Sequence, residues 1–144
     1  METNDIVMSG VQLKKLISKK AEPVMEEYDL RSVELDILVF LHNEKNVDTA
    51  KGIIERKHLS KAHISKSIDN LRTGGFIQIT EDEEDHRVLH IRLTDKSNEV
   101  IRKMSGVYAE CRDIMMNGIS EEELNIVKTV LRHMNENVNR ALGE

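Results

Sequence analysis

The stretch that decides the fold runs from Leu59 to Leu93 and reads LSKAHISKSIDNLRTGGFIQITEDEEDHRVLHIRL. Ser60 is a good helix N-cap, because a serine hydroxyl can accept a hydrogen bond from a free N–H group of the first turn. Ile64, Ile68 and Leu71 follow at spacings of four and three residues, so they share one helical face. The stretch therefore predicts a helix that starts after Ser60 and buries this face.

Two glycines end the predicted helix. Gly74 and Gly75 suit this place because the residue past a helix end often needs a positive φ. Residues 76–80 and 88–93 then read as strands, and aliphatic side chains alternate in the second of them. The pattern predicts a helix, a tight stop and a β-hairpin with a long charged tip. The residues expected in the core of this unit are Ile64, Ile68, Leu71, Phe76, Ile91 and Leu93.

The outward side of the same helix carries small, basic or amide side chains, which can reach base edges in a major groove. These residues are Lys61, Ala62, His63, Lys66, Asn70 and Thr73. Between Lys51 and Thr73 there are six basic and two acidic side chains, a local charge of +4 in a chain whose net charge is −5. A positively charged patch on an otherwise acidic protein is typical of an element that faces phosphates. We therefore predict binding to nucleic acid.

The preceding segment completes a helix-turn-helix. We expect Ser32 to cap a helix that ends near Asn43, although its apolar middle also fits a buried strand. A short strand is expected at 46–48, followed by a brief helix that Asp48 caps and that ends at Lys57. Two short helices joined by a tight turn, the second with basic and small residues at its start, form a helix-turn-helix.

Both ends of the chain are predicted to be helical. A first helix is expected over 5–28, interrupted by Pro23, which should kink or split it. Thr94 should cap a long helix through Asn117, and Ser120 should open another in a capping box with Glu123. These last two helices carry heptad-like apolar stripes. The stripes fit an intramolecular hairpin or a dimer interface, and we favour the dimer because three amphipathic helices lie outside residues 32–93.

The composition of the chain limits the classes of protein to which it can belong. The chain has 144 residues, enough for one domain, and its single cysteine excludes an internal disulfide framework. The sequence has no apolar run of the roughly 20 residues that a membrane span needs, and no signal peptide pattern. We therefore expect a cytoplasmic protein that does not bind membranes. Cys111 lies on an apolar helical stripe and is expected to be a buried packing thiol rather than a reactive one.

The chain resembles the MarR family of winged helix-turn-helix transcription regulators over nearly its whole length in element order, most closely from Ser60 to Thr94. The similar segments are LSKAHISKSIDNLRTGGFI, EDEEDHR and LHIRLT, with the wing pattern D-x-R at Asp85–Arg87. The resemblance implies a mainly α winged-helix (α+β) fold and a single unit over 1–144. Within it, residues 32–93 would form the DNA-binding lobe, and 1–31 and 94–144 a helical dimerisation region.

The resemblance also implies roles for individual residues. A homodimer would insert one recognition helix per subunit into a major groove, with Lys61, Ala62, His63 and Lys66 facing the bases. The expected phosphate contacts are Ser60, Ser65 and Arg72. Arg87 would enter a minor groove, with Asp85 holding it by a charge-assisted hydrogen bond. The implied partners are double-stranded DNA, a second copy of the chain and an unidentified small-molecule effector that releases a repressor from a palindromic operator.

An enzyme and a protein-binding adaptor are the two other functional classes for a chain of this kind. The six histidines form no H-E-x-x-H pair, and the chain has no C-x-x-C motif or Gly-rich phosphate loop, so no enzyme, metal or cofactor is predicted. A winged-helix adaptor that binds a protein partner is the alternative function. Five consecutive acids at 81–85 would repel phosphate unless they are folded away from it.

Overall fold

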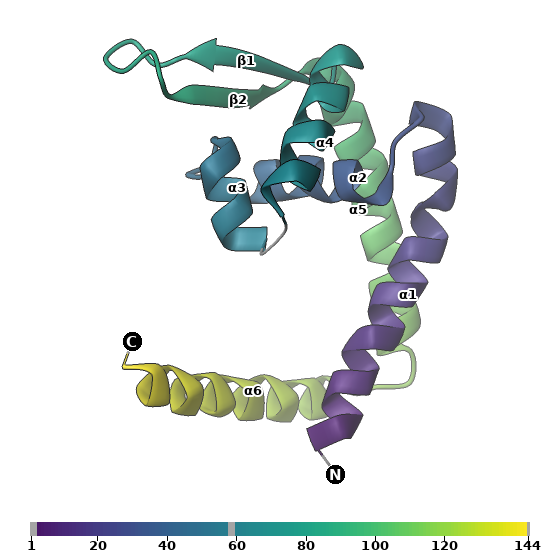
Figure 1. Cartoon of the computed structure of the whole chain (residues 1–144). Coiled ribbons are helices and arrows are strands. Elements are labelled where there is room, and N and C mark those ends of the chain that lie inside the picture. The colour runs from purple at the N-terminus through teal and green to yellow at the C-terminus, as the bar shows by residue number, and fades with distance from the viewer. Residues whose placement is uncertain (1–2, 58–59, 144) are drawn as a thin grey trace. The chain divides into compact units, whose positions relative to one another are not determined.

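The computed structural model describes residues 3–57 and 60–143 (Figure 1). In this part of the chain there are six helices and one two-stranded antiparallel sheet. The elements are α1 (Thr3–Tyr28), α2 (Ser32–Asn43), α3 (Ala50–Lys57), α4 (Lys61–Thr73), β1 (Ile77–Glu81), β2 (Leu89–Leu93), α5 (Asp95–Met116) and α6 (Glu121–Leu142). The chain divides into two compact units, Met1–Cys111 and Arg112–Glu144. The predicted mainly α fold with a β-hairpin wing is confirmed.

The first helix is not split at its proline. Pro23 lies inside α1, which continues to Tyr28, so the helix is not split at this residue. A proline removes one hydrogen bond from a helix interior, and that loss is local. Ala21 and Val24, on either side of Pro23, are buried in the core, and this packing holds the helix together.

The segment Ser32–Asn43 forms the expected helix, α2, and not a buried strand. Leu35, Ile37 and Leu38 are buried, which explains the nearly continuous apolar run. The expected cap at Ser32 is wrong, because the N-cap position belongs to Arg31. The backbone N–H of Arg31 donates to Glu34 Oε2 at 2.8 Å, so the glutamate supplies the capping bond from the third position of the helix.

The segment before α3 also differs from the prediction. The expected strand at 46–48 is absent from this described segment, and only one backbone hydrogen bond, from Ile91 N to Asp48 O at 2.6 Å, joins it to β2. Thr49 rather than Asp48 caps α3, since its hydroxyl accepts from Gly52 N at 3.1 Å. The Asp48 side chain is therefore free to bond elsewhere, and it contacts His90.

The deciding stretch folds as predicted. Ser60 caps α4, with its hydroxyl accepting from His63 N at 3.3 Å, and Gly75 has a φ of +77° at the stop. The strands β1 and β2 pair antiparallel from Ile77 with Leu93 to Glu81 with Leu89. Figure 1 shows this hairpin projecting as a wing beyond α4.

One core joins α1, α2, α3, α4, the hairpin and α5. Five of the six predicted core residues are buried: Ile64, Ile68, Leu71, Phe76 and Ile91. The sixth, Leu93, is half-buried and packs against that core. Thr94 precedes α5, but its hydroxyl donates to the carbonyl oxygens of Gly75 and Phe76 at 2.7 and 3.1 Å instead of capping the helix. This contact fixes the base of the wing to the end of α4.

The C-terminal helix has the predicted start. Ser120 and Glu123 form a capping box, and Gly118 takes a φ of +80° in the turn before it. No residue of α6 is buried in this chain. The exposed apolar residues of the helix are Ile126, Val127, Val130, Leu131, Met134, Val138 and Leu142. A stripe of this kind is typical of a helix that packs against a partner.

Candidate nucleic-acid interface

The outward face of α4 gathers the residues predicted at its start. Ser60, Lys61, Ala62, His63, Ser65 and Lys66 are all exposed, while the opposite face packs into the core. Among the residues that the structure describes, neither Lys61 nor Lys66 forms an ion pair within the chain. Ser60 Oγ also lies 3.1 Å from His63 Nδ1, which fixes the histidine beside the helix start. The face therefore offers two free ammonium groups next to a helix N-terminus, where anions are favoured.

The later turns of α4 are already engaged within the chain. Arg72 Nη2 lies 3.4 Å from Asp69 Oδ1, an exposed pair that salt and solvent weaken. Asn70 Nδ2 donates to Glu34 Oε1 at 2.8 Å. The sequence predicts Asn70 among the side chains able to reach bases, but this hydrogen bond directs its amide to Glu34 of α2 instead.

Glu34 accepts hydrogen bonds from both Asn70 and Arg31, and the sequence did not reveal these contacts. Its side chain is buried, and Arg31 donates to Oε1 from Nε at 2.9 Å and from Nη2 at 2.6 Å. Burial alone would raise the pKa of this carboxyl, but hydrogen bonds from Arg31 and Asn70 outweigh it and lower the pKa below its usual value. The ionised carboxylate ties the start of α2 to the end of the predicted recognition helix.

Other basic groups continue the positive surface onto α3. Arg56 is exposed, and Lys51 lies 3.9 Å from Glu55 in a surface pair one helical turn apart. Pairs at this distance and exposure are weak, so Lys51 remains accessible to an anion.

The wing tip holds Arg87 in a fork-shaped contact. The guanidinium donates from Nε to Asp85 Oδ1 at 2.9 Å and from Nη2 to Asp85 Oδ2 at 3.1 Å. This hydrogen bond raises the pKa of Arg87 and lowers the pKa of Asp85. The Arg87 side chain is still 90% exposed, so the contact orients the guanidinium without covering it.

The acidic run in the wing is folded onto itself. Asp82 Oδ1 accepts from the backbone N–H groups of Glu84 and Asp85, each at 2.9 Å. Asp82 Oδ2 lies 3.0 Å from His90 Nε2, and Glu81 Oε2 lies 3.3 Å from His86 Nδ1. Three of the five acids therefore have a cationic or titratable partner, which reduces the repulsion expected between this loop and phosphate.

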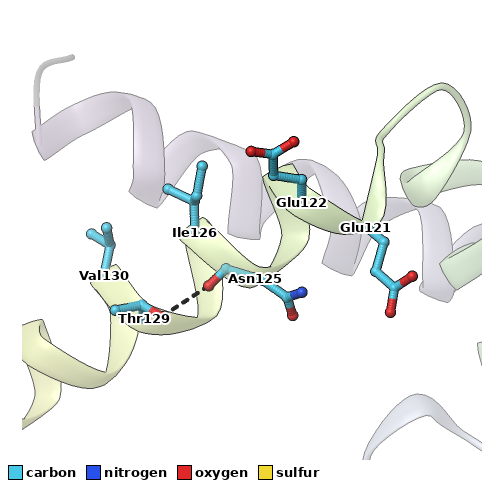
Figure 2. A pocket seen from close by; sticks show the side chains of 6 residues that line it. All are labelled: Glu121, Glu122, Asn125, Ile126, Thr129 and Val130. Atoms are coloured by element: carbon cyan, nitrogen blue, oxygen red, sulfur yellow. Dashed lines mark hydrogen bonds between the residues drawn. The ribbon is translucent and has the colours of Figure 1, made fainter.

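Among the hollows in the described part of the chain, two lie on the helices at the ends of the chain. One, of about 260 Å³, is lined by residues of α1, α2 and α5, including Leu13, Ile17, Asp36 and Tyr108. The other is an open surface along the first turns of α6, shown in Figure 2, where Ile126 and Val130 point the same way one turn apart. No group of three or more metal-ligating side chains occurs in the described part of the chain, and no described helix is long and apolar enough to cross a membrane.

Comparisons with known proteins agree that this chain is similar to transcriptional regulators. Residues 13–104 match the family model described as "Transcriptional regulator SarA/Rot". An HTH-type transcriptional regulator, BilQ of Clostridioides difficile (strain CD3), is 22% identical over 133 residues, which cover 92% of this chain and 88% of BilQ. A MarR protein from Peptoclostridium difficile DA00132 superposes with a TM-score of 0.74 at 21% identity, covering 98% of this chain and 91% of that one. A Staphylococcus aureus MepR–DNA complex gives a TM-score of 0.64 at 20% identity, with 88% and 95% covered.

Proposed function

Because the chain belongs to the SarA/Rot family of transcriptional regulators and has the winged-helix fold of the MarR proteins, we propose that it binds double-stranded DNA as a homodimer and controls transcription. The observation that carries the proposal is the exposed, unpaired basic start of α4, from Ser60 to Lys66. A helix of this kind fits a B-DNA major groove, which admits one α-helix. The MepR–DNA complex supports the proposal, since a protein of the same fold is bound to DNA there.

The roles within α4 follow from charge and position. Lys61, Ala62, His63 and Lys66 face the bases. Ser60, Ser65 and Arg72 contact phosphates, with Arg72 exchanging its weak bond to Asp69 for a phosphate oxygen. The Arg72–Asp69 pair is a single exposed contact of 3.4 Å. A phosphate can accept two parallel hydrogen bonds from the same guanidinium, so the exchange is favourable.

The wing adds a second contact. Arg87 enters the minor groove beside the site that α4 occupies, where A·T-rich sequence narrows the groove and concentrates negative potential. Asp85 holds the guanidinium in an extended position before DNA arrives. The lobe that carries both contacts is residues 32–93.

The dimer forms through the terminal helices, 1–31 and 94–144. Its main support is the exposed apolar stripe of α6, which covers seven large side chains and has no partner within the described part of this chain. Val11 on α1 adds a further exposed apolar side chain. Two copies related by a twofold axis would bury these surfaces and present two α4 helices to a palindromic site.

The regulator acts in the cytoplasm as a repressor that a small-molecule effector releases. The hollow lined by Ile17, Asp36 and Tyr108 is the candidate effector site, because it lies where α1 and α5 of the dimerisation region meet α2 of the lobe. A molecule seated there would favour one placement of the lobe over another and so change affinity for the operator. An adaptor that binds a protein partner is the competing function, and the free positive charge of α4 argues against it.

Substituting Lys66 by alanine tests the proposal directly. The variant should bind its DNA site about 1 kcal/mol more weakly, because a base-facing ammonium group is lost. The slope of log K against log salt should become less steep by about one at most, since that ammonium charge also displaces counterions from the phosphates beside the groove. Both quantities come from fluorescence anisotropy titrations at several salt concentrations.

Lys19 is the matched control, since it is an exposed lysine on α1 outside residues 32–93. Lys19→Ala should leave affinity and salt slope unchanged. Binding by the unmodified chain that does not respond to salt, or no binding at low ionic strength, would favour the adaptor.

A further inference from the structure

One histidine joins the wing to the helix-turn-helix. His90 of β2 has Nδ1 2.8 Å from Asp48 Oδ2, in the segment before α3, and Nε2 3.0 Å from Asp82 Oδ2, in the wing loop. The three side chains are only 25%, 39% and 35% exposed, so water competes weakly for these bonds. The backbone bond from Ile91 to Asp48 reinforces the same junction. The His90 ring and this backbone hydrogen bond therefore join the wing to the segment before α3.

The geometry requires a particular protonation state. An ionised carboxylate accepts hydrogen bonds and has none to donate, so each carboxylate here needs an N–H from the ring. A neutral imidazole carries one N–H and an imidazolium carries two. Both contacts of His90 can therefore be hydrogen bonds only when the ring is positively charged.

We propose that protonated His90 is a positioning residue that clamps the wing in its DNA-binding geometry, so that the affinity for DNA depends on the charge of this one side chain. The proposal rests on the DNA-binding function argued above. It concerns how the wing is held, and it names protons as the ligand that regulates it.

The clamp reaches the proposed minor-groove contact through Asp82. One oxygen of Asp82 is held by His90, and the other accepts the backbone N–H groups of Glu84 and Asp85. The turn made in this way sets the position of the Asp85 carboxylate, which in turn holds Arg87. Loss of the imidazolium would also leave the negative charge of Asp82 uncompensated in a loop that approaches phosphate.

The surroundings of the ring set the direction of the pH effect. The charged groups that it contacts are Asp48 and Asp82; its partner across the hairpin is the uncharged Thr80, and Arg92 lies two residues along the same strand. Hydrogen bonds to Asp82 and then Asp48 raise the pKa of His90 above its ordinary 6.5, although burial opposes them. The hydrogen bond from His90 is also the largest cause that lowers the pKa of Asp82, to about 2.

The direction in which DNA affinity changes with pH follows from these pKa shifts. A histidine whose pKa is raised on folding contributes its full stabilisation below the unfolded value, and loses it as the pH rises through the folded value. The carboxylate of Asp82 stays ionised throughout this range. The wing should therefore be held at pH 6 and released toward pH 9, and DNA affinity should fall over the same interval.

The test compares pH profiles of DNA affinity at constant ionic strength. The probe is a palindromic duplex selected from a random library, titrated from pH 6 to 9 with the full-length chain and with His90→Gln. Glutamine keeps an amide donor but cannot gain charge, so the wild-type chain should lose on the order of threefold to tenfold more affinity across this range than the variant. His42→Gln is the matched control, an exposed histidine at the end of α2, and it should keep the wild-type profile.

A second variant protects the test against misfolding of the first. Asp48→Asn removes one carboxylate while keeping the shape of the side chain, so it should lower the pKa of His90 measured by NMR and move the midpoint of the affinity profile to lower pH. Identical profiles for the wild type and His90→Gln, with no shift in Asp48→Asn, would overturn the clamp and leave DNA binding intact. Failure of every variant to bind any duplex at pH 6 and low salt would instead overturn the proposed function, and the clamp with it.

Discussion

Replacing Leu131 by glutamate is expected to leave the chain monomeric and to weaken operator binding by about a hundredfold or more. Leu131 lies in the middle of the exposed apolar stripe of α6. In the proposed dimer the substitution would bury two unpaired carboxylates, one from each copy, which is strongly unfavourable. A monomer could engage only one half-site at a time, and the gain from linking two binding events would be lost.

Sedimentation velocity measures the oligomeric state, and the same samples give the affinity. Asn125→Glu is the matched control, because Asn125 is an exposed residue about a third of a turn around α6 from Leu131 and is not one of its large apolar side chains, so the same charge there should leave the dimer intact. Figure 2 shows Asn125 pointing away from the side that carries Ile126 and Val130. A Leu131→Glu chain that remains dimeric, with unchanged affinity, would show that α6 is not the interface.

Replacing Arg87 by alanine is expected to weaken binding by about 1–3 kcal/mol, mainly on operators with A·T-rich flanks. The wild-type side chain is 90% exposed and is oriented by Asp85, so little reorganisation is needed before it enters a narrow groove. Truncation removes the guanidinium and leaves the negative charge of Asp85 unpaired near phosphate. Both effects weaken binding to DNA.

The comparison that isolates the minor-groove contact uses two duplexes with the same half-sites and either A·T or G·C flanks. Wild-type protein should prefer the A·T flanks, and Arg87→Ala should lose this preference. Arg102→Ala is the control, since Arg102 is exposed on α5, outside residues 32–93. An Arg87→Ala variant that keeps the full flank preference would mean that the wing stays off the DNA.

Local patterns in the sequence were enough to predict most of the fold. Ser60 and the Gly74–Gly75 pair set the limits of α4 because caps and stops depend on neighbouring residues. The Ser120–Glu123 capping box and the alternation in β2 were predictable for the same reason. The buried state of Cys111 follows from its place on an apolar stripe.

The features that the sequence did not reveal depend on contacts between distant residues. Asn70 and Glu34 are 36 positions apart, and His90 and Asp48 are 42 apart, so no local pattern pairs them. The incorrect cap at Asp48 has the same origin, since its carboxylate bonds to His90 while Thr49 caps α3. At Pro23 the buried neighbours outweigh the local preference against helix.

The measurement that tests the central claim most directly is the number of chains bound to a DNA site selected from random duplexes. If two copies present their α4 helices together, selection should yield a palindrome whose half-sites lie about one helical turn apart, and sedimentation should find two chains on each duplex. A selected site without twofold symmetry that binds a single chain, or a library from which no site is enriched, would contradict the proposal.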